Sequence, residues 1–189
     1  MKIRTPLLCI DAGHGGKDHG GGSNQYFLEK ELNLKISLYQ AKRCEQLKIE
    51  YVLTRKSDQY LTPHHRTKLV RNSGARYCFS NHVNRGGGKG AEVIHSLYDT
   101  TILPHLIMDE LVQVGMKKRR VFTRHLPGQP NRDYYFMHRD TAHVAVQIIE
   151  YGFADHPSDT QFLLNHWQPL AEAPLKALCQ FLHLSYYPP

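Results

Sequence analysis

Two histidines and a glutamate stand at or near the ends of apolar stretches in this sequence. His14 lies in a glycine-rich loop just after the first apolar stretch, at residues 7–11. His82 ends the third stretch, at 76–82, and Glu150 lies in the sixth, at 145–153. A carboxylate at position 150 is costly to bury among its apolar neighbours unless a metal ion, a hydrogen bond or a reaction requires it. Because parallel strands place their ligands at their carboxyl ends, we expect these three side chains to converge at one edge of a sheet.

The glycine-rich loop, "GHGGKDHGGG" at residues 13–22, lacks the pattern of a phosphate-binding loop. It matches neither G-x-G-x-x-G followed by a helix nor G-x-x-x-x-G-K-[ST]. The sequence therefore argues against a nucleotide-binding protein.

Strand and helix patterns alternate along the chain, which is typical of an α/β domain. Strands are expected at 7–11, 50–55, 76–82, 91–98, 120–123 and 145–153. Helices are expected at 29–47, 62–74, 102–114, 159–165 and 168–184. Thr62 is the expected cap of the second helix, and Ser158 with Gln161 has the capping-box spacing for the fourth.

These elements predict a single α/β domain over residues 1–185, followed by the possible start of a linker at 186–189. Its core is expected to be a twisted sheet of about six strands, mostly parallel or mixed, with helices on both faces. Four cysteines have no close pairing, which predicts buried or incidental thiols rather than a disulfide framework.

The formal net charge of +7 favours an acidic partner, such as nucleic acid, an anionic membrane surface or a bacterial cell wall. The compact basic run "KKRR" at 117–120 is expected to be a solvated helix end. No apolar stretch is long enough for a membrane span, and the apolar residues before Asp11 are too few for the core of a signal peptide. The sequence therefore predicts a protein synthesised in the cytoplasm.

Four motifs in order resemble one known family. The first motif is "IDAGHGGKDHGG" and the second is "LEKELNLKIS". The third is "FSNHVN", which is followed by "GAEV", and the fourth is "IIEYGF", which is followed by "SD". Together they extend from Ile10 to about Asp159. This pattern is similar to the zinc-dependent N-acetylmuramoyl-L-alanine amidases of type 3. The resemblance implies an enzyme of peptidoglycan degradation, either a phage endolysin or a bacterial autolysin.

The resemblance implies that His14, Glu29 and His82 hold one Zn²⁺ ion. Two imidazoles and one carboxylate are the ligand set of an open catalytic zinc site, which agrees with that assignment. Glu31 is also acidic, but the motif "EKELNL" selects Glu29, which can point back from the start of a helix toward a strand end.

By the same resemblance, Glu150 is the catalytic base, and the reaction is metal-assisted hydrolysis of the amide between N-acetylmuramic acid and L-alanine. Arg66 matches a family arginine and is a candidate substrate contact, although a structural ion pair is the commoner role. Asn84 is expected to shape the loop or to support a metal ligand. His64, His65, His138 and His143 are expected not to be ligands.

The sequence departs from the family pattern at Asn81, where an apolar residue is usual, and at His156 and Pro157. The segment 99–144 is too short for the long blocking helix of regulated division amidases, so an uncovered active site is expected. Within it, residues 123–143 form an expected surface loop whose aromatic residues 134–136 are a candidate wall of the groove.

Two other functions stay open from the sequence. One is a zinc peptidase that cleaves a bond of the stem peptide, and the other is a non-catalytic wall-binding or nucleic-acid-binding domain with the same fold. The expected partner is peptidoglycan rather than nucleic acid, and the expected state is a monomer that reaches the wall after release from the cell.

Overall fold

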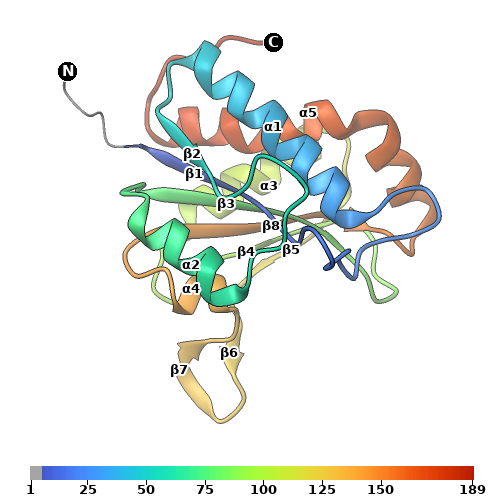
Figure 1. Ribbon diagram of the computed structural model, residues 1–189. Coiled ribbons are helices and arrows are strands. Elements are labelled where there is room, and N and C mark those ends of the chain that lie inside the picture. Colours follow the sequence, from blue (N-terminus) through green and yellow to red (C-terminus); the bar gives the residue numbers. More distant parts are fainter. Residues whose placement is uncertain (1–5) are drawn as a thin grey trace.

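A six-stranded mixed sheet forms the centre of the computed structural model, which describes residues 6–189 (Figure 1). The strand order is β2-β1-β3-β8-β4-β5. Strands β1, β2, β3 and β8 run parallel, β4 is antiparallel to β8, and β5 is parallel to β4. The strand bounds are β1 Leu8–Ala12, β2 Tyr51–Leu53, β3 Tyr77–Asn84, β4 Ala91–Ile94, β5 Lys118–Phe122 and β8 Ala145–Phe153. The predicted single α/β domain with a mostly parallel, mixed sheet is confirmed.

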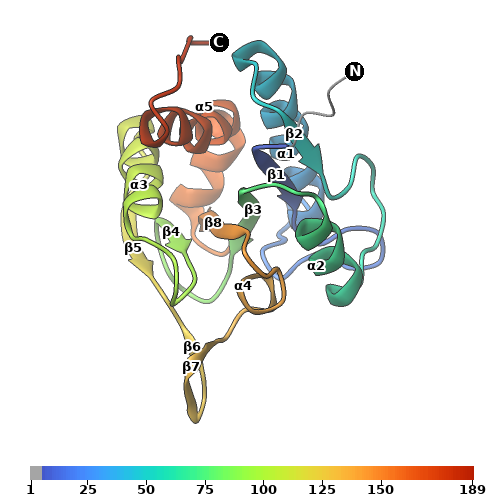
Figure 2. The same cartoon turned by 90° about the vertical axis from the view of Figure 1, so that its left-hand side faces the viewer.

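Three long helices pack with the larger core cluster on one face of the sheet, and two short helices lie with the smaller cluster on the other (Figures 1 and 2). The long helices are α1 Glu29–Leu47, α3 Ile102–Val114 and α5 Pro157–Phe181, and the short ones are α2 Pro63–Asn72 and α4 Phe136–Arg139. The second face therefore has much less helical cover.

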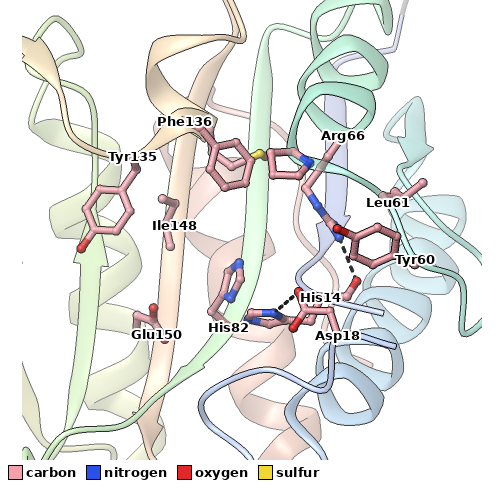
Figure 3. A pocket seen from close by; sticks show the side chains of 12 residues that line it. His14, Asp18, Tyr60, Leu61, Arg66, His82, Tyr135, Phe136, Ile148 and Glu150 are labelled. Carbon is pink, nitrogen blue, oxygen red and sulfur yellow. Dashed lines mark hydrogen bonds and ion pairs between the residues drawn. The ribbon is translucent and has the colours of Figure 1, made fainter. Parts of the chain in front are cut away.

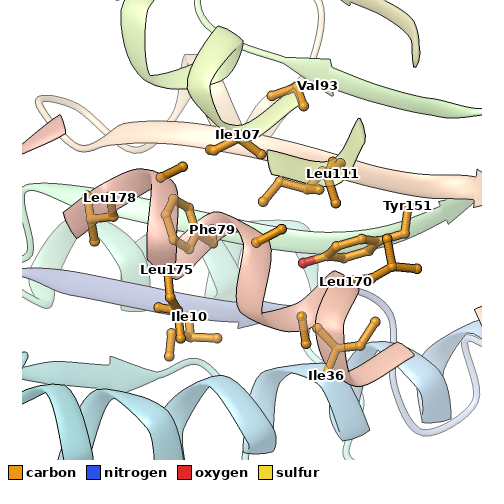
Figure 4. Packing of buried hydrophobic residues seen from close by; sticks show 14 of the residues in the cluster. Ile10, Ile36, Phe79, Val93, Ile107, Leu111, Tyr151, Leu170, Leu175 and Leu178 are labelled. Atoms are coloured by element: carbon orange, nitrogen blue, oxygen red, sulfur yellow. The ribbon is translucent and has the colours of Figure 1, made fainter. Parts of the chain in front are cut away.

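Alternation along the strands divides the apolar side chains between the two faces. In β8, Ile149 and Tyr151 pack in the larger cluster, whereas Val146 and Ile148 pack in the smaller one. Figure 4 shows part of the larger cluster, where Phe79 and Tyr151 of the sheet meet residues of the long helices. Because Glu150 is two residues after Ile148 in the same strand, its side chain points to the same, sparsely covered face.

Asn81, where the family resemblance leads us to expect an apolar residue, lies in the core with its polar groups paired. Its Nδ2 donates to Ser37 Oγ at 2.8 Å and to Gln40 Oε1 at 2.9 Å, and its Oδ1 accepts from the Tyr151 hydroxyl at 2.8 Å. All of these groups are buried, so the network satisfies a polar side chain inside the core.

Two sequence predictions are wrong in detail. The run at 117–120 is not a helix end, because Lys118–Phe122 forms the edge strand β5 beside β4. The helix after β8 begins at Pro157 with His156 as its N-cap, and no side chain caps it, so the expected capping box is absent.

Other local predictions are confirmed. Thr62 caps α2 by accepting a hydrogen bond from the His65 backbone. α5 has non-helical backbone angles at His166, which agrees with the break expected between two C-terminal helices. The four cysteines, Cys9, Cys44, Cys78 and Cys179, are free and buried.

The expected surface loop contains an antiparallel hairpin, β6 His125–Leu126 and β7 Gln129–Asp133, followed by α4. The hairpin projects away from the main sheet (Figures 1 and 2). No helix within residues 6–189 combines the length and apolar character needed to cross a lipid bilayer.

Candidate metal centre and catalytic groove

His14, Glu29 and His82 converge on one point. One potential ligand atom from each lies within 4.8 Å of the other two. Glu29 Oε1 is 3.2 Å from His14 Nε2 and 3.1 Å from His82 Nδ1. The structure therefore brings together the three residues that the family resemblance implies as metal ligands, although they come from a loop, a helix and a strand.

The backbone of the loop after β1 directs His14 toward this point. His14 has a φ of 60°, which is uncommon for a residue with a side chain. Its Nδ1 lies 2.9 Å from Asp18 Oδ2, and its carbonyl accepts a hydrogen bond from Arg66 Nη2 at 2.8 Å (Figure 3). Side-chain and backbone contacts together hold the imidazole in place.

Arg66 is buried and ties the loop to β1. Its Nη1 donates to Asp11 Oδ1 at 2.6 Å and to the Ala12 carbonyl at 2.7 Å. Asp11 also accepts hydrogen bonds from Thr54 and Ser80. Burial opposes ionisation of Asp11, but Arg66 and the hydroxyl donors outweigh it and lower the pKa of the carboxyl.

Glu29 is the first residue of α1 and is only 1% exposed. The backbone amide of Gly22 donates to its Oε2 at 2.7 Å, and the amide of Val83 donates to its Oε1 at 3.1 Å. Burial alone would raise its pKa, yet the contacts with His14 and His82 hold the pKa well below the usual range. A charged carboxylate is therefore fixed at the centre of the cluster.

Two glycines make room for the ligands. A Cβ atom at Gly13 would lie 2.2 Å from His82 Cε1, and one at Gly20 would lie 2.3 Å from Glu29 Oε2. Gly20 also has a φ of +86°, which disfavours any other residue. The glycine-rich sequence thus allows the loop backbone to approach the ligand side chains closely.

Glu150 lies beside the cluster, because β3 and β8 pair His82 with Glu150. Its Oε2 is buried and has no hydrogen-bond partner among residues 6–189. Burial raises the pKa of Glu150 to about 7, and the charge of His82 partly opposes this rise. Figure 3 shows Glu150 and His82 at the same end of the pocket.

Asn84 supports the strand next to the site rather than contacting the three clustered side chains. Its Nδ2 donates to Glu92 Oε2 at 2.9 Å, and its Oδ1 accepts from the Arg85 backbone at 2.8 Å. Glu92 pairs with Glu150 in the antiparallel register of β4 and β8. Asn84 therefore orders a carboxylate that neighbours Glu150.

A cavity of about 220 Å³ opens over these residues (Figure 3). Its charged and polar lining residues are His14, Asp18, Arg66, His82 and Glu150. Its apolar walls come from Tyr60, Leu61 and Pro63 near α2, and from Tyr135, Phe136 and Met137 around α4. The sequence expectation of an aromatic wall holds for Tyr135 and Phe136, while Tyr134 does not line the cavity.

Arg55, which no sequence pattern marked as part of the site, is only 1% exposed. Arg55 donates to the carbonyls of Ala12, Gly13 and Lys30 at 2.7 to 3.0 Å. These bonds join the end of β1 and the start of the loop after it to the first turn of α1. No motif marked this role in the sequence, because the partners of Arg55 are backbone oxygens and not side chains.

The donor set suits a divalent cation. Two neutral imidazoles and one carboxylate are a common three-residue ligand set for catalytic zinc, which leaves a further position for water or substrate. The cavity lies over the same residues, so that position is accessible. The four other histidines examined in the sequence, 64, 65, 138 and 143, are not members of the cluster.

Comparisons with known proteins show the family of the domain. Residues 8–180 match the family model of N-acetylmuramoyl-L-alanine amidase, Amidase_3. The amidase CwlM of Bacillus licheniformis is 30% identical over 94% of this chain and 69% of its own length. A sporulation-specific amidase of Bacillus subtilis is 34% identical over 82% of this chain, which spans 59% of that relative.

Solved structures share the fold. An N-acetylmuramoyl-L-alanine amidase from Clostridium difficile 630 superposes with a TM-score of 0.79 at 27% identity, over 95% of this chain and 98% of that one. The catalytic domain of CwlV from Bacillus (Paenibacillus) polymyxa reaches 0.82 at 22% identity, over 95% and 99%. With the family match covering the sheet, the flanking helices and every residue of the His14–Glu29–His82 cluster, the chain belongs to the N-acetylmuramoyl-L-alanine amidase family.

Proposed function

We propose that this chain hydrolyses the amide between N-acetylmuramic acid and L-alanine in peptidoglycan, with Zn²⁺ held by His14, Glu29 and His82. The observation that carries the proposal is the convergence of these ligands beside the partnerless, buried Oε2 of Glu150 at the base of an open cavity. The family of the chain supports the choice of bond.

The ligand residues have separate tasks. The Asp18 carboxylate and Arg66 orient His14, whereas the amides of Gly22 and Val83 fix the carboxylate of Glu29. When bound at this point, a divalent cation supplies Lewis acidity to the substrate carbonyl and to water. The low exposure of Glu29 keeps solvent from competing for its oxygens.

Glu150 is proposed as the general base. Its Oε2 takes the proton from a water molecule as that water attacks the carbonyl carbon, and it then delivers the proton to the amine nitrogen of the departing L-alanine. A pKa raised to about 7 by burial suits both steps, because the carboxyl can accept and release a proton near neutral pH.

The cavity walls are proposed to position the substrate. Tyr60 and Leu61 face Tyr135 and Phe136 across the polar groups (Figure 3). Apolar side chains on two sides can contact the sugar ring and the alanine methyl group while the amide lies over His82 and Glu150. We expect the protein to act as a monomer on the bacterial cell wall.

The proposal is tested with purified peptidoglycan and a soluble muramoyl peptide, using wild type, Glu150→Gln and a chelated sample. Metal analysis and mass spectrometry of the new chain ends provide the readouts. We expect new L-alanine amino termini with the metal-loaded wild type, about one zinc ion per chain, and a loss of at least about 10³-fold in rate for Glu150→Gln with metal content unchanged.

Other outcomes identify the alternatives. Cleavage between stem-peptide residues would replace the proposal with a zinc peptidase. Tight binding of wall without any cleavage would indicate a binding domain. Full activity with Mn²⁺ or Co²⁺ but not Zn²⁺ would contradict the assigned metal, since the same ligands accept neighbouring divalent ions.

A further inference from the structure

The excess of positive over negative charge in the chain is concentrated in one segment. Residues 117–132 contain six Lys and Arg residues and no Asp or Glu, whereas the other residues contain 18 basic and 17 acidic ones. The segment comprises β5, the β6–β7 hairpin except Asp133, and their connection, and is called here the basic arm. Nearly the whole net charge of +7 therefore comes from this arm.

The charges of the basic arm are exposed and mostly unpaired. All six basic residues are exposed. Among residues 6–189, Arg119 and Arg120 share the carboxylate of Glu92, and no carboxylate lies within 4.0 Å of the other four cations. Arg124 instead stacks on Tyr134 at 3.8 Å. A large positive charge is thus available to an external partner.

Most of the arm does not stabilise the core. No residue from 123 to 132 belongs to either hydrophobic cluster or packs against one. The hairpin projects from the sheet on the side of the short helices (Figure 2). Basic residues on the edge strand β5 also oppose pairing with another chain, but that role does not explain Arg124 and Arg132, which lie beyond it.

The basic arm begins and ends next to the catalytic groove. Arg120 of β5 contacts Glu92, which pairs with Glu150 in the register of β4 and β8. After the hairpin, the chain continues directly into Tyr135 and Phe136, which line the cavity. A ligand held along the arm would therefore keep the groove close to the material to which that ligand is attached.

We propose that the basic arm is a docking surface for a phosphodiester-linked anionic polymer attached to peptidoglycan. The proposal rests on the proposed function, which places the chain on the bacterial wall. Arginine forks bind phosphate oxygens in bidentate geometry. At about 3.3 Å per residue, the extended chain from Lys118 to Leu126 reaches up to about 26 Å, which suits a repeating phosphate chain better than a single stem-peptide carboxylate.

The test compares two variants that remove the same charge. Lys118→Glu/Arg132→Glu changes the basic arm, and Lys42→Glu/Lys48→Glu changes two exposed lysines on and just after α1, away from the hairpin. Co-sedimentation measures binding to intact walls and to walls stripped of phosphodiester-linked polymer with hydrofluoric acid. Hydrolysis of the soluble muramoyl peptide measures the active site separately.

We expect the arm variant to bind intact walls about tenfold more weakly than wild type at low salt, and the α1 variant to bind within about twofold. Stripped walls should bind wild type and the arm variant equally, and both variants should hydrolyse the soluble peptide at the wild-type rate. An equal loss on stripped walls would assign the arm to stem-peptide carboxylates and overturn the proposal, as would equal losses for the two variants. Absence of soluble-peptide hydrolysis by wild type would instead refute the proposed function.

Discussion

At the scale of single residues, the carboxylate of Glu29 governs the charge of the site. Burial tends to lower the pKa of His14, but the hydrogen bond and negative charge of Glu29 outweigh it and raise the pKa to about 9. Without a cation, His14 is therefore protonated at neutral pH and compensates Glu29. A metal ion requires the same imidazole nitrogen in its neutral form, so the proton and the metal compete.

This competition has a measurable sign. Because His14 holds its proton below about pH 9, we expect zinc affinity to rise roughly tenfold per pH unit between about pH 6 and 9, with release of about one proton per ion bound. Isothermal titration calorimetry in buffers of different ionisation enthalpy measures both quantities. At pH 8, where the Glu150 carboxyl is already largely ionised, Glu150→Gln serves as the control and should show the same proton release, whereas affinity independent of pH would contradict the assigned state of His14.

The convergence of His14, His82 and Glu150 could be anticipated from the sequence, since each follows a strand of a predominantly parallel sheet or lies near the carboxyl end of one. Glu29 was different. It begins a helix instead of ending a strand, so its choice over Glu31 depended on the family motif and on the direction in which the first residue of a helix can point. Arg55 had no such motif, because its partners are backbone carbonyls, of Ala12, Gly13 and Lys30, which leave no signature in the side-chain pattern.

At the scale of elements, the loop after β1 depends on the absence of side chains at particular positions. The backbone at Gly13 passes so close to the His82 ring that a Cβ atom there would overlap it. Gly21, in the same loop, has no atom within 4 Å of its corresponding position and lacks a positive φ. Substitutions at these two glycines therefore distinguish two effects. A side chain at Gly13 tests the close approach to His82, whereas a side chain at Gly21 tests only the loss of a glycine from the loop.

Gly13→Ala should displace His82 and weaken the site. We expect a loss of about 10²-fold in kcat/KM on the soluble muramoyl peptide, because displacements near 1 Å have effects of this size, together with reduced zinc content. Gly21→Ala should retain wild-type activity and metal content. Normal zinc affinity in Gly13→Ala would show that the contact with His82 relaxes without consequence.

Among the elements, patterned helices were easier to predict than the edge of the sheet. The apolar periodicity of α1 and α2 and the residues at which they begin and end are local properties of the sequence. Both helices occur near their expected positions. The basic run in β5 was assigned wrongly, because charge alone does not distinguish a helix end from an edge strand. Pairing with β4, a contact distant in sequence, decides its structure.

At the scale of the whole molecule, the two faces of the sheet have different roles. The long helices α1, α3 and α5 cover one face with the larger apolar cluster, while the groove occupies the other. Within the covered face, Arg43 of α1 binds Glu172 of α5 through Nε at 2.9 Å and Nη2 at 3.0 Å. Both residues are buried, so this pair connects two helices far from the reacting groups.

Removal of one partner from this pair should reduce stability without changing the active site. Glu172→Ala leaves the guanidinium of Arg43 buried without its carboxylate, so we expect the free energy of unfolding to fall by about 3–5 kcal/mol. Lys176→Met removes the more exposed pair with Glu110 and should cost less than about 1 kcal/mol. Urea unfolding measures both values, and kcat/KM of the folded Glu172→Ala protein should equal that of wild type. Similar losses of stability in the two variants would contradict a special role for the buried pair, and a lower kcat/KM would show that the two faces of the sheet are coupled.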